Sequence, residues 1–201
     1  AAAWDPVGGR ILVFGGRTYN DLLGGVWAVD VATNNVTELA PSGVGPAPRY
    51  GHKVAVDAAR SRVLLVGGRG AHDLFDDVWS FDLSTPDGAW TELVPAGDLL
   101  EPRLGHSLHF DTDGDRLILF GGQGLSDLYG SVWTLSFATL ADGVWEQLSS
   151  TGALPDARTT HGAAWDDDEQ RLFVGGGRAA LDAPTDLYVW HGNAGPAGSW
   201  T

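Results

Sequence analysis

The sequence lacks cysteine and methionine altogether, and its only lysine is Lys53. Without cysteine, the chain has no disulfide, no thiolate ligand for a metal ion and no thiol nucleophile. It also lacks any apolar run near the roughly 20 residues that a membrane-spanning helix requires. These absences exclude thiol chemistry and argue against insertion into a membrane.

Basic charge is scarce too, because 12 Lys and Arg residues stand against 26 Asp and Glu residues, which gives a formal net charge of −14. A nucleic-acid partner requires clustered lysine and arginine to neutralise its phosphates, and an anionic membrane surface attracts the same side chains. We therefore expect neither partner. No signal peptide is visible, so the sequence leaves the compartment open, with the cytoplasm slightly favoured.

What the sequence does contain is an internal repeat. The tetrapeptide Arg-x-x-His begins at Arg49, Arg103 and Arg158, at intervals of 54 and 55 residues. A Gly-Gly pair recurs in phase with it, at residues 15–16, 67–68, 121–122 and 176–177. A fixed period of this length is typical of one supersecondary unit stacked several times, so the repeat predicts the fold.

Each repeat contains four segments that are typical of short β-strands. In the second copy these segments are residues 52–56, 62–66, 78–81 and 90–93. The segment before each Gly-Gly pair is an unbroken apolar run, which indicates a strand covered on both faces. No segment has a 3.6-residue apolar period, so helices should be scarce. We predict an all-β fold of four blades, each with four antiparallel strands.

This pattern resembles the kelch repeat. The resemblance rests on the Gly-Gly pairs and on two aromatic columns, in the third and fourth strands. These columns are Trp27, Trp79, Trp133 and Tyr188, and Trp90, Trp145 and Trp200. Val36 and Gly175 depart from the pattern, in the fourth strand of the first copy and directly before the last Gly-Gly pair. The resemblance, closest to the longer-repeat kelch scaffold and effector proteins, implies a β-propeller that binds other proteins.

We expect residues 1–201 to form a single domain, with blades at about residues 1–48, 49–102, 103–157 and 158–201. Kelch-like rings usually close with five to seven blades, most often six, so we expect these four blades to be a segment of a larger ring. The first copy lacks its Arg-x-x-His, and no methionine starts the chain, which agrees with this expectation. A closed ring of four blades is the alternative.

Two columns of arginine provide the sharpest functional hypothesis. The post-glycine arginines directly follow a Gly-Gly pair; they are Arg17, Arg69 and Arg178. The opening arginines begin the first strand of a blade; they are Arg49, Arg103 and Arg158. The loops that carry both sets leave the same strand ends, so we expect both sets, together with Tyr50, on one face of the blades.

An arginine-bearing face suits a ligand with carboxylates, because the guanidinium fork binds a carboxylate through two parallel hydrogen bonds. Some propellers of the family that this chain resembles hold an acidic motif with arginines at these two positions. We therefore propose the six arginines and Tyr50 as candidate residues for binding a partner protein. The alternative, strongest for the opening arginines, is a structural role in which they bond the backbone of neighbouring blades.

Other candidate sites have simpler explanations. His52, His106 and His161 recur once per blade, and we expect them to anchor strands rather than to share one metal ion. The acidic runs at residues 111–115 and 166–169 resemble calcium loops, but they fall where a hairpin turn needs Asp and Gly. No nucleophile–base pair or phosphate-binding loop stands out, and the kelch-like copper oxidases require a cysteine. We expect no cofactor, no metal and no catalysis.

The sequence thus predicts a scaffold for protein–protein interaction, with the partner held by loops on the arginine-bearing face. One alternative is a carbohydrate-binding or non-redox sugar-active module, which would use the aromatic residues near that face. These are Tyr19, Tyr50, Phe75 and Tyr129. The other alternative is a structural docking component of a large assembly.

Overall fold

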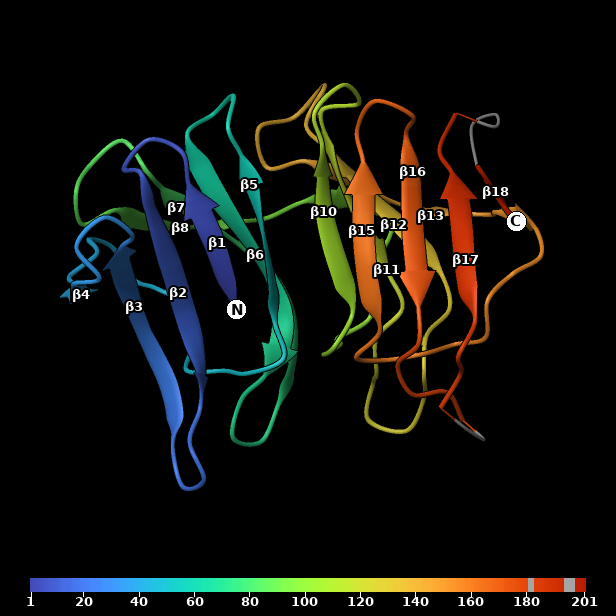
Figure 1. The fold of residues 1–201 in the computed structure, drawn as a ribbon, viewed down its shortest axis with the longest axis horizontal. Helices are drawn as coiled ribbons and strands as arrows, with labels where there is room; N and C mark the ends of the chain where they lie inside the picture. Colours follow the sequence, from blue (N-terminus) through green and yellow to red (C-terminus); the bar gives the residue numbers. More distant parts are fainter. Residues whose placement is uncertain (181–182, 194–197) are drawn as a thin grey trace. The chain divides into compact units, whose positions relative to one another are not determined.

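The chain is built from β-strands. A computed structural model describes residues 1–180, 183–193 and 198–201, and every regular element in these ranges is a β-strand (Figure 1). The chain divides into two compact units, Ala1–Val94 and Pro95–Thr201. Each unit contains two antiparallel sheets, so the prediction of an all-β chain made from four copies of one sheet is confirmed. Within the described ranges, no helix is long and apolar enough to cross a membrane.

The first unit contains two sheets of four strands, which we call the first and second blades. The first blade has the strand order β1 (Ala2–Asp5), β2 (Arg10–Arg17), β3 (Leu22–Asp30) and β4 (Val36–Leu39). The second blade has the order β5 (Lys53–Asp57), β6 (Arg62–Arg69), β7 (Leu74–Asp82) and β8 (Ala89–Leu93). Consecutive strands pair antiparallel in both blades, as the repeat predicts.

The second unit contains the third and fourth blades, each with one additional short strand. The third blade has the order β10 (Ser107–Asp111), β11 (Arg116–Phe120), β12 (Val132–Ser136), β13 (Val144–Leu148) and β9 (Ala96–Gly97). The fourth blade has β15 (Gly162–Asp166), β16 (Arg171–Gly175), β17 (Leu187–His191), β18 (Ser199–Trp200) and β14 (Thr151–Gly152). That all four blades belong to one domain and to a larger ring stays a prediction.

The additional strands are the linkers that precede each blade. β9 pairs parallel with β13, and β14 pairs parallel with β18. Each linker contains a glycine with positive φ, +92° at Gly97 and +91° at Gly152. A Cβ on either glycine would lie closer than 2.5 Å to a tryptophan carbonyl oxygen of the paired strand. The recurring linker glycine therefore allows the linker to lie directly against the blade that follows it.

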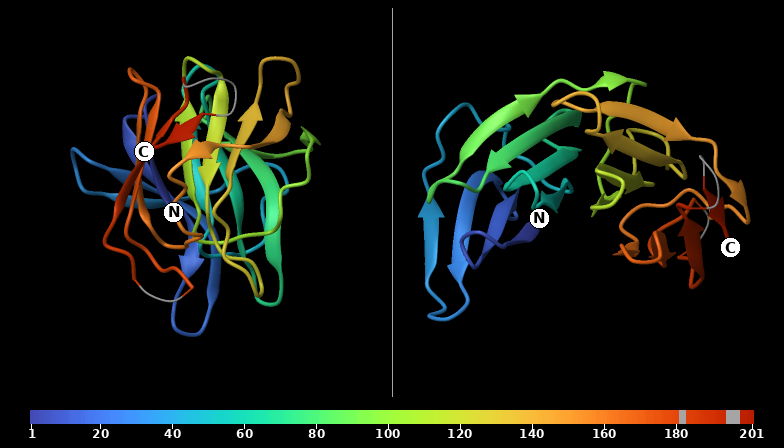
Figure 2. Two further views of the ribbon diagram at one scale, coloured as in Figure 1. Left: turned by 90° about the vertical axis from the view of Figure 1, so that its right-hand side faces the viewer. Right: turned by 90° about the horizontal axis from the view of Figure 1, so that it is seen from above.

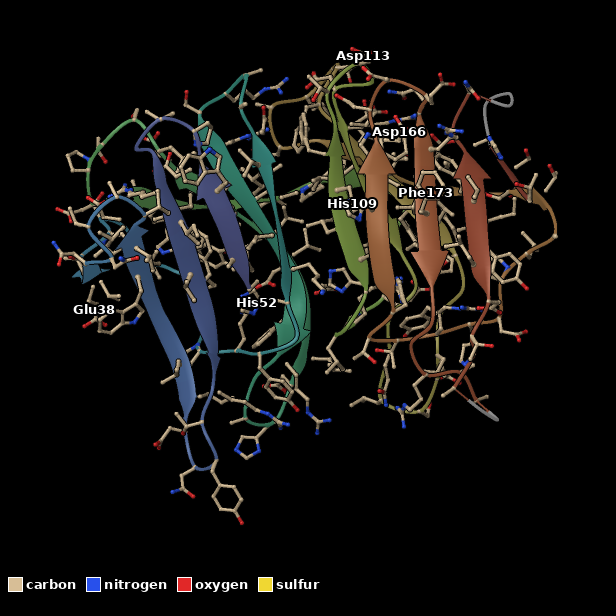
Figure 3. The ribbon with its side chains drawn as sticks, viewed as in Figure 1. Glu38, His52, His109, Asp113, Asp166 and Phe173 are labelled. Carbon is tan, nitrogen blue, oxygen red and sulfur yellow. The ribbon has the colours of Figure 1, made fainter. Side chains whose placement is uncertain are left out.

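The first hairpin of every blade is closed by an ion pair between an Asp and the Arg five residues later. The side-chain distances are 2.9 Å for Asp5–Arg10, 2.8 Å for Asp57–Arg62, and 2.7 Å for both Asp111–Arg116 and Asp166–Arg171. These carboxylates also accept hydrogen bonds from amides of the turn. The hydrogen bond from the Arg171 guanidinium lowers the pKa of Asp166, which Figure 3 labels. The acidic runs therefore have a structural role in the turns.

The apolar core of each unit lies between its two sheets, which face each other (Figure 2). In the first unit, the Phe14 ring packs edge-on against Phe81 and Trp90, at centroid distances of 5.4 and 5.7 Å. In the second unit, Phe120 packs against Trp200 at 5.0 Å. Trp90 and Trp200 of the fourth-strand column thus fill space between the two blades of a unit, as the column predicts.

One face of the first blade is apolar and exposed. Side chains alternate along β2, so Leu12 and Phe14 pack against the second blade while Ile11 lies on the opposite face. On that opposite face, Trp4, Trp27 and Val36 are 50%, 40% and 60% exposed. Val36 is the residue that replaces the fourth-strand tryptophan, so the departure noted in the sequence falls on this exposed face.

Candidate binding site in the loops beside the glycine pairs

The Gly-Gly pairs allow the opening segment of the next blade to approach closely. Gly15 and Gly16 have φ of +51° and +121°, and a Cβ on Gly15 would lie 3.0 Å from the carbonyl oxygen of Arg49. The amide of Gly16 donates a hydrogen bond of 2.9 Å to that same oxygen. In the second unit, the amide of Gly122 donates to the carbonyl of Arg158, also at 2.9 Å. The glycines thus hold two neighbouring blades together at the point where the candidate loops begin.

The opening arginine of the second blade lies in the interior. Arg49 is 2% exposed, and its guanidinium donates hydrogen bonds to the carbonyl oxygens of Ala47 and Gly67, at 3.0 and 2.9 Å. It also forms a bidentate ion pair with Asp77, with a distance of 2.7 Å from Nη2 to Oδ2, and lies 3.9 Å above the ring of Phe75. All of these contacts are made within the first unit.

The other two opening arginines repeat this arrangement in the second unit. Both are fully buried, and each donates to the carbonyl of the first residue of a Gly-Gly pair. Arg158 pairs with the carboxylate of Asp186, whereas Arg103 pairs with Glu101. Burial lowers the pKa of Arg103 to about 10, against the opposing effect of Glu101. The guanidinium groups are occupied inside the blades, which favours the structural alternative for the opening arginines.

Two of the aromatic side chains that a sugar site would use are engaged by the opening arginines. Phe75 lies beneath Arg49, and the ring of Tyr129 lies 4.3 Å from the guanidinium of Arg103. Tyr19 and Tyr50 remain as aromatic candidates in the loops of the first unit. Fewer aromatic rings are therefore available to a sugar ligand than the four that the sequence suggests.

The post-glycine arginines are exposed, and the two in the first unit lie at the ends of long strands. In the first unit, β2 ends at Arg17 and β6 ends at Arg69. Tyr50, the residue after an opening arginine, is joined to Arg69 by two backbone hydrogen bonds of 3.0 and 2.8 Å. The guanidinium of Arg17, which comes from the preceding blade, lies 4.4 Å above the ring of Tyr50. The structure thus brings three of the predicted site residues together.

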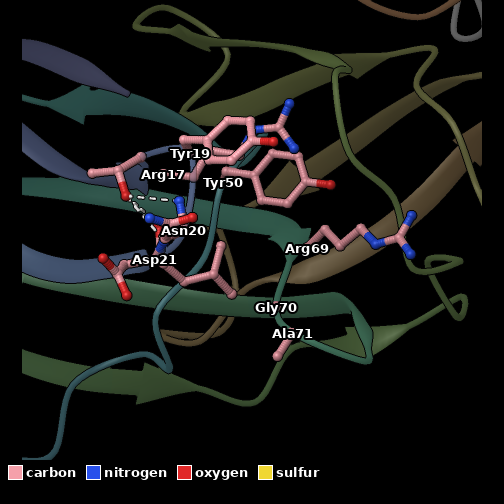
Figure 4. A pocket seen from close by; sticks show the side chains of 10 residues that line it. Arg17, Tyr19, Asn20, Asp21, Tyr50, Arg69, Gly70 and Ala71 are labelled. Atoms are coloured by element: carbon pink, nitrogen blue, oxygen red, sulfur yellow. Dashed lines mark hydrogen bonds between the residues drawn. The ribbon is translucent and has the colours of Figure 1, made fainter.

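These three residues line a pocket of about 880 Å³ in the first unit. Figure 4 shows Arg17, Tyr19 and Tyr50 grouped together, with Arg69 extending from the other side of Tyr50. The pocket is completed by the turn at residues 18–21, in which the Thr18 hydroxyl accepts hydrogen bonds from the amides of Asn20 and Asp21. This turn places the ring of Tyr19 in solvent. The pocket therefore offers guanidinium, phenol and carboxamide groups to a ligand.

The equivalent loops of the second unit form a different pocket, of about 510 Å³. The backbone frame is the same, because Thr159 and Arg178 exchange two hydrogen bonds of 3.0 and 2.9 Å. The side chains differ: Thr159 stands where the first unit has Tyr50, and Gln123 stands where it has Arg17. Arg178 donates a 2.8 Å hydrogen bond to the side-chain oxygen of Gln123. That Arg178 acts together with the arginines of the first unit stays a prediction.

The structure adds two residues to the candidate site. Asn20 lines the first pocket, and Gln123 holds the arginine of the second pocket. Both occupy loop positions defined by the repeat, but the residue at each position varies from copy to copy, and neither Asn20 nor Gln123 carries a charge. The loop aspartate of the fourth copy, Asp182, lies outside the described residues.

Two of the recurring histidines, His52 and His161, lie at the seams between the two blades of a unit. His52, labelled in Figure 3, is 3% exposed, and its Nε2 donates to the carbonyl of Phe14 in the preceding blade at 3.1 Å. Burial lowers the pKa of His52 to about 3, so the ring is neutral near pH 7. In the second unit, His161 packs edge-on against Phe120 at 5.3 Å. These contacts fit strand anchors, and in the described residues no three His, Cys, Asp or Glu side chains gather as a metal site.

Comparison with known proteins identifies the repeat. A protein-family model, the KLHDC2/KLHL20/DRC7 Kelch-repeats domain, matches residues 1–140 and 84–195. The chain belongs to the kelch-repeat family. Kelch repeats generally act as modules for protein–protein interaction.

Curated relatives match this chain along most of its length. Tip elongation aberrant protein 1 of Schizosaccharomyces pombe is 29% identical over 92% of the chain and 16% of its own length. An F-box/kelch-repeat protein of Arabidopsis thaliana is 28% identical over 84% of the chain and 40% of its own length. The Arabidopsis serine/threonine-protein phosphatase BSL2 is 30% identical over 76% of the chain and 15% of its own length.

The kelch chain therefore spans less than half the length of each of these relatives. The phosphatase name describes a protein of which the match covers 15%, so it is no evidence for catalysis by the kelch repeats. The relatives support a kelch module, but they identify neither a specific partner nor a binding face.

Proposed function

We propose that this kelch chain is a protein-interaction module whose partner binds at the loops around Arg17, Tyr50 and Arg69. The observation that carries the proposal is the guanidinium of Arg17, held 4.4 Å above the ring of Tyr50 beside a pocket of about 880 Å³. Arginine and tyrosine, with tryptophan, are enriched among the residues that dominate binding energy in protein interfaces. The opening arginines support the pocket from within the blades instead of contacting the partner.

The chemistry of the pocket favours a short acidic segment of the partner. Two exposed guanidinium groups, Arg17 and Arg69, can each form paired hydrogen bonds with a carboxylate. The chain as a whole has a formal net charge of −14, and Asp21 also lines the pocket. Long acidic runs would therefore be repelled by the surrounding surface, whereas one or two carboxylates placed at the arginines would be attracted.

A carbohydrate ligand is the second candidate. Tyr19 and Tyr50 provide apolar ring faces, and Asn20 and Asp21 provide planar polar groups in the same pocket. Sites for small ligands commonly combine apolar surfaces with a few polar groups of this kind. The third possibility, a docking component of a large assembly, stays a prediction. The exposed apolar face of the first blade agrees with it.

Affinity capture with the intact chain tests the proposal. We expect the double substitution Arg17→Ala and Arg69→Ala to remove most bound partner protein, with a loss of affinity of about tenfold or more. The matched control is Arg60→Ala, which removes another partly exposed arginine from a hairpin turn outside the pocket. A free acidic peptide, (Gly-Glu)3, should compete with the captured partner.

Two results would contradict the proposal. Equal capture by the double variant and the Arg60→Ala control would show that the pocket does not hold the partner. Competition by a neutral oligosaccharide, but not by (Gly-Glu)3, would favour the carbohydrate candidate instead.

A further inference from the structure

The two pockets share a backbone frame but use their arginines differently. In each unit, the residue after the Gly-Gly pair of one blade reaches the loop of the next blade. Arg17 lies over the ring of Tyr50 in the first unit, whereas Gln123 accepts a hydrogen bond from Arg178 in the second. The difference lies in the ring of Tyr50, over which the guanidinium of Arg17 is held.

The backbone that carries the Tyr50 ring is held in place by the fold. Its backbone exchanges two hydrogen bonds with Arg69, and its neighbour Arg49 is anchored inside the second blade. Two residues further on, the imidazole of His52 is bonded to the carbonyl of Phe14 in the preceding blade. A ring attached between two buried anchors forms a preorganised platform.

Arg17, in contrast, is an exposed side chain with many rotamers. A guanidinium that stacks on an aromatic ring uses its flat face, so its N–H edge stays directed outward and available. Stacking on Tyr50 also restricts the rotamers of Arg17 before any partner arrives, which lowers the ordering cost of binding. The ring therefore presents the donors of Arg17 to the pocket.

In the second unit, Thr159 occupies the position of Tyr50. Thr159 has no ring on which an arginine could stack, and one Nη of Arg178 is already bonded to Gln123. Its pocket thus contains an arginine whose donors are partly engaged by a neutral side chain. The residue at the Tyr50 position differs in each copy that has it: Tyr50, Leu104 and Thr159.

We propose that Tyr50 is a positioning residue, whose ring orients the guanidinium of Arg17 toward a partner carboxylate and makes the pocket of the first unit the one that binds anions. This inference rests on the proposed function. According to this inference, the residue at the Tyr50 position of each copy determines which ligands the neighbouring loops bind.

The test is a double-mutant cycle, with binding of fluorescein-labelled (Gly-Glu)3 measured by fluorescence anisotropy. Tyr50→Phe keeps the ring and should bind within about twofold of the wild type. Tyr50→Leu, which introduces the residue of the third copy, should bind about two- to fivefold more weakly, as expected for loss of an exposed cation–π contact. In the Arg17→Ala background, Tyr50→Leu should cause no further loss, because its effect passes through Arg17.

A gain-of-function variant tests the same idea in the second unit. Gln123→Arg together with Thr159→Tyr rebuilds the stack there, and we expect the number of bound peptides per chain to rise from one to two. Gln123→Arg alone is the matched control, since it adds the charge without the platform. Because Thr159 is buried, the melting temperature of each variant should be measured alongside binding.

The outcomes separate the two proposals. If Arg17→Ala leaves peptide binding unchanged, the proposed function fails. If Arg17→Ala weakens binding but Tyr50→Leu weakens it equally with or without Arg17, Tyr50 acts independently and the positioning role is wrong. If Tyr50→Phe binds as weakly as Tyr50→Leu, the hydroxyl rather than the ring is responsible, which also overturns the inference.

Discussion

The two units are most alike in their buried seams and least alike in their exposed loops. In the first unit, β2 and β6 each have 8 residues and continue through the Gly-Gly pair to a post-glycine arginine. In the second unit, β11 and β16 each have 5 residues and end at or before the glycines. The β2–β3 hairpin consequently extends well beyond its blade (Figure 1). Interior residues preserve the repeat, whereas solvent-exposed loops are free to differ.

The seam contacts show why the interior is preserved. Each opening arginine donates to a carbonyl oxygen of a Gly-Gly pair and also pairs with a carboxylate. Replacing one of these groups would leave a buried partner without its hydrogen bonds, which is costly. A loop residue such as Tyr19 has no such partner to lose, so its identity can change.

The largest expected effect is the loss of an opening arginine. Arg49→Ala should lower the free energy of unfolding by about 3 kcal/mol, because it leaves Asp77 without its cationic partner and the buried carbonyl of Gly67 without its arginine donor. Arg158→Ala should lower it by about 2 kcal/mol, because the side chain of Asp186 is 35% exposed, against 20% for Asp77. Urea denaturation measures both. Losses below about 1 kcal/mol would mean that the seams do not depend on these arginines.

An intermediate effect is expected from pH. The pKa of His52 in the folded chain is about 3, against 6.5 for an ordinary histidine, so the unfolded chain binds the additional proton between these values. Titration of His52 should therefore leave stability unchanged above about pH 6.5 and lower it below that pH, by up to about 1.4 kcal/mol per pH unit. His52→Gln, which keeps a donor for the carbonyl of Phe14, should flatten this dependence. An equally steep fall in that variant would assign the acid sensitivity to other groups.

The smallest expected effect concerns the residue after Tyr50 and its equivalents. Gly51 and Gly105 have φ of +69° and +66°, and the fourth blade has Thr160 at φ +55° instead. A β-branched residue is strained in this conformation. Thr160→Gly should therefore raise the free energy of unfolding by about 0.5 kcal/mol, whereas Gly51→Thr should lower it by about 1–2 kcal/mol. If both changes are neutral, backbone strain does not distinguish the two units.

The sequence predicts the blades well because the residues that recur in the repeat are mostly the buried ones. The Gly-Gly pairs, the tryptophan column and the Asp–Arg hairpins each recur for a reason that is local to one blade or one seam. The role of the opening arginines is harder to predict. Recurrence shows that Arg49 serves the repeat, but its carboxylate partner Asp77 lies 28 residues away, at a position that is Ser131 in the third copy.

The pocket is less predictable than the fold. That Arg17 and Tyr50 share a face follows from strand order, but their stacking depends on a side-chain conformation between two blades. Gln123 carries no charge, so nothing in its column indicates that it binds Arg178. The division of the chain after Val94 has no signal in the sequence either, since the linker there is as long as the other two.

The parallel pairing of the linkers has a consequence for solubility. The outermost strand of a sheet exposes unpaired N–H and C=O groups, to which a strand of another molecule can add. β9 and β14 cover this edge on β13 and β18, and Ser42 makes the equivalent bridge beside β8. The linker that precedes a blade thus also covers the outer edge of that blade, so replacing it with a flexible tether of equal length would invite aggregation even where the blades still fold.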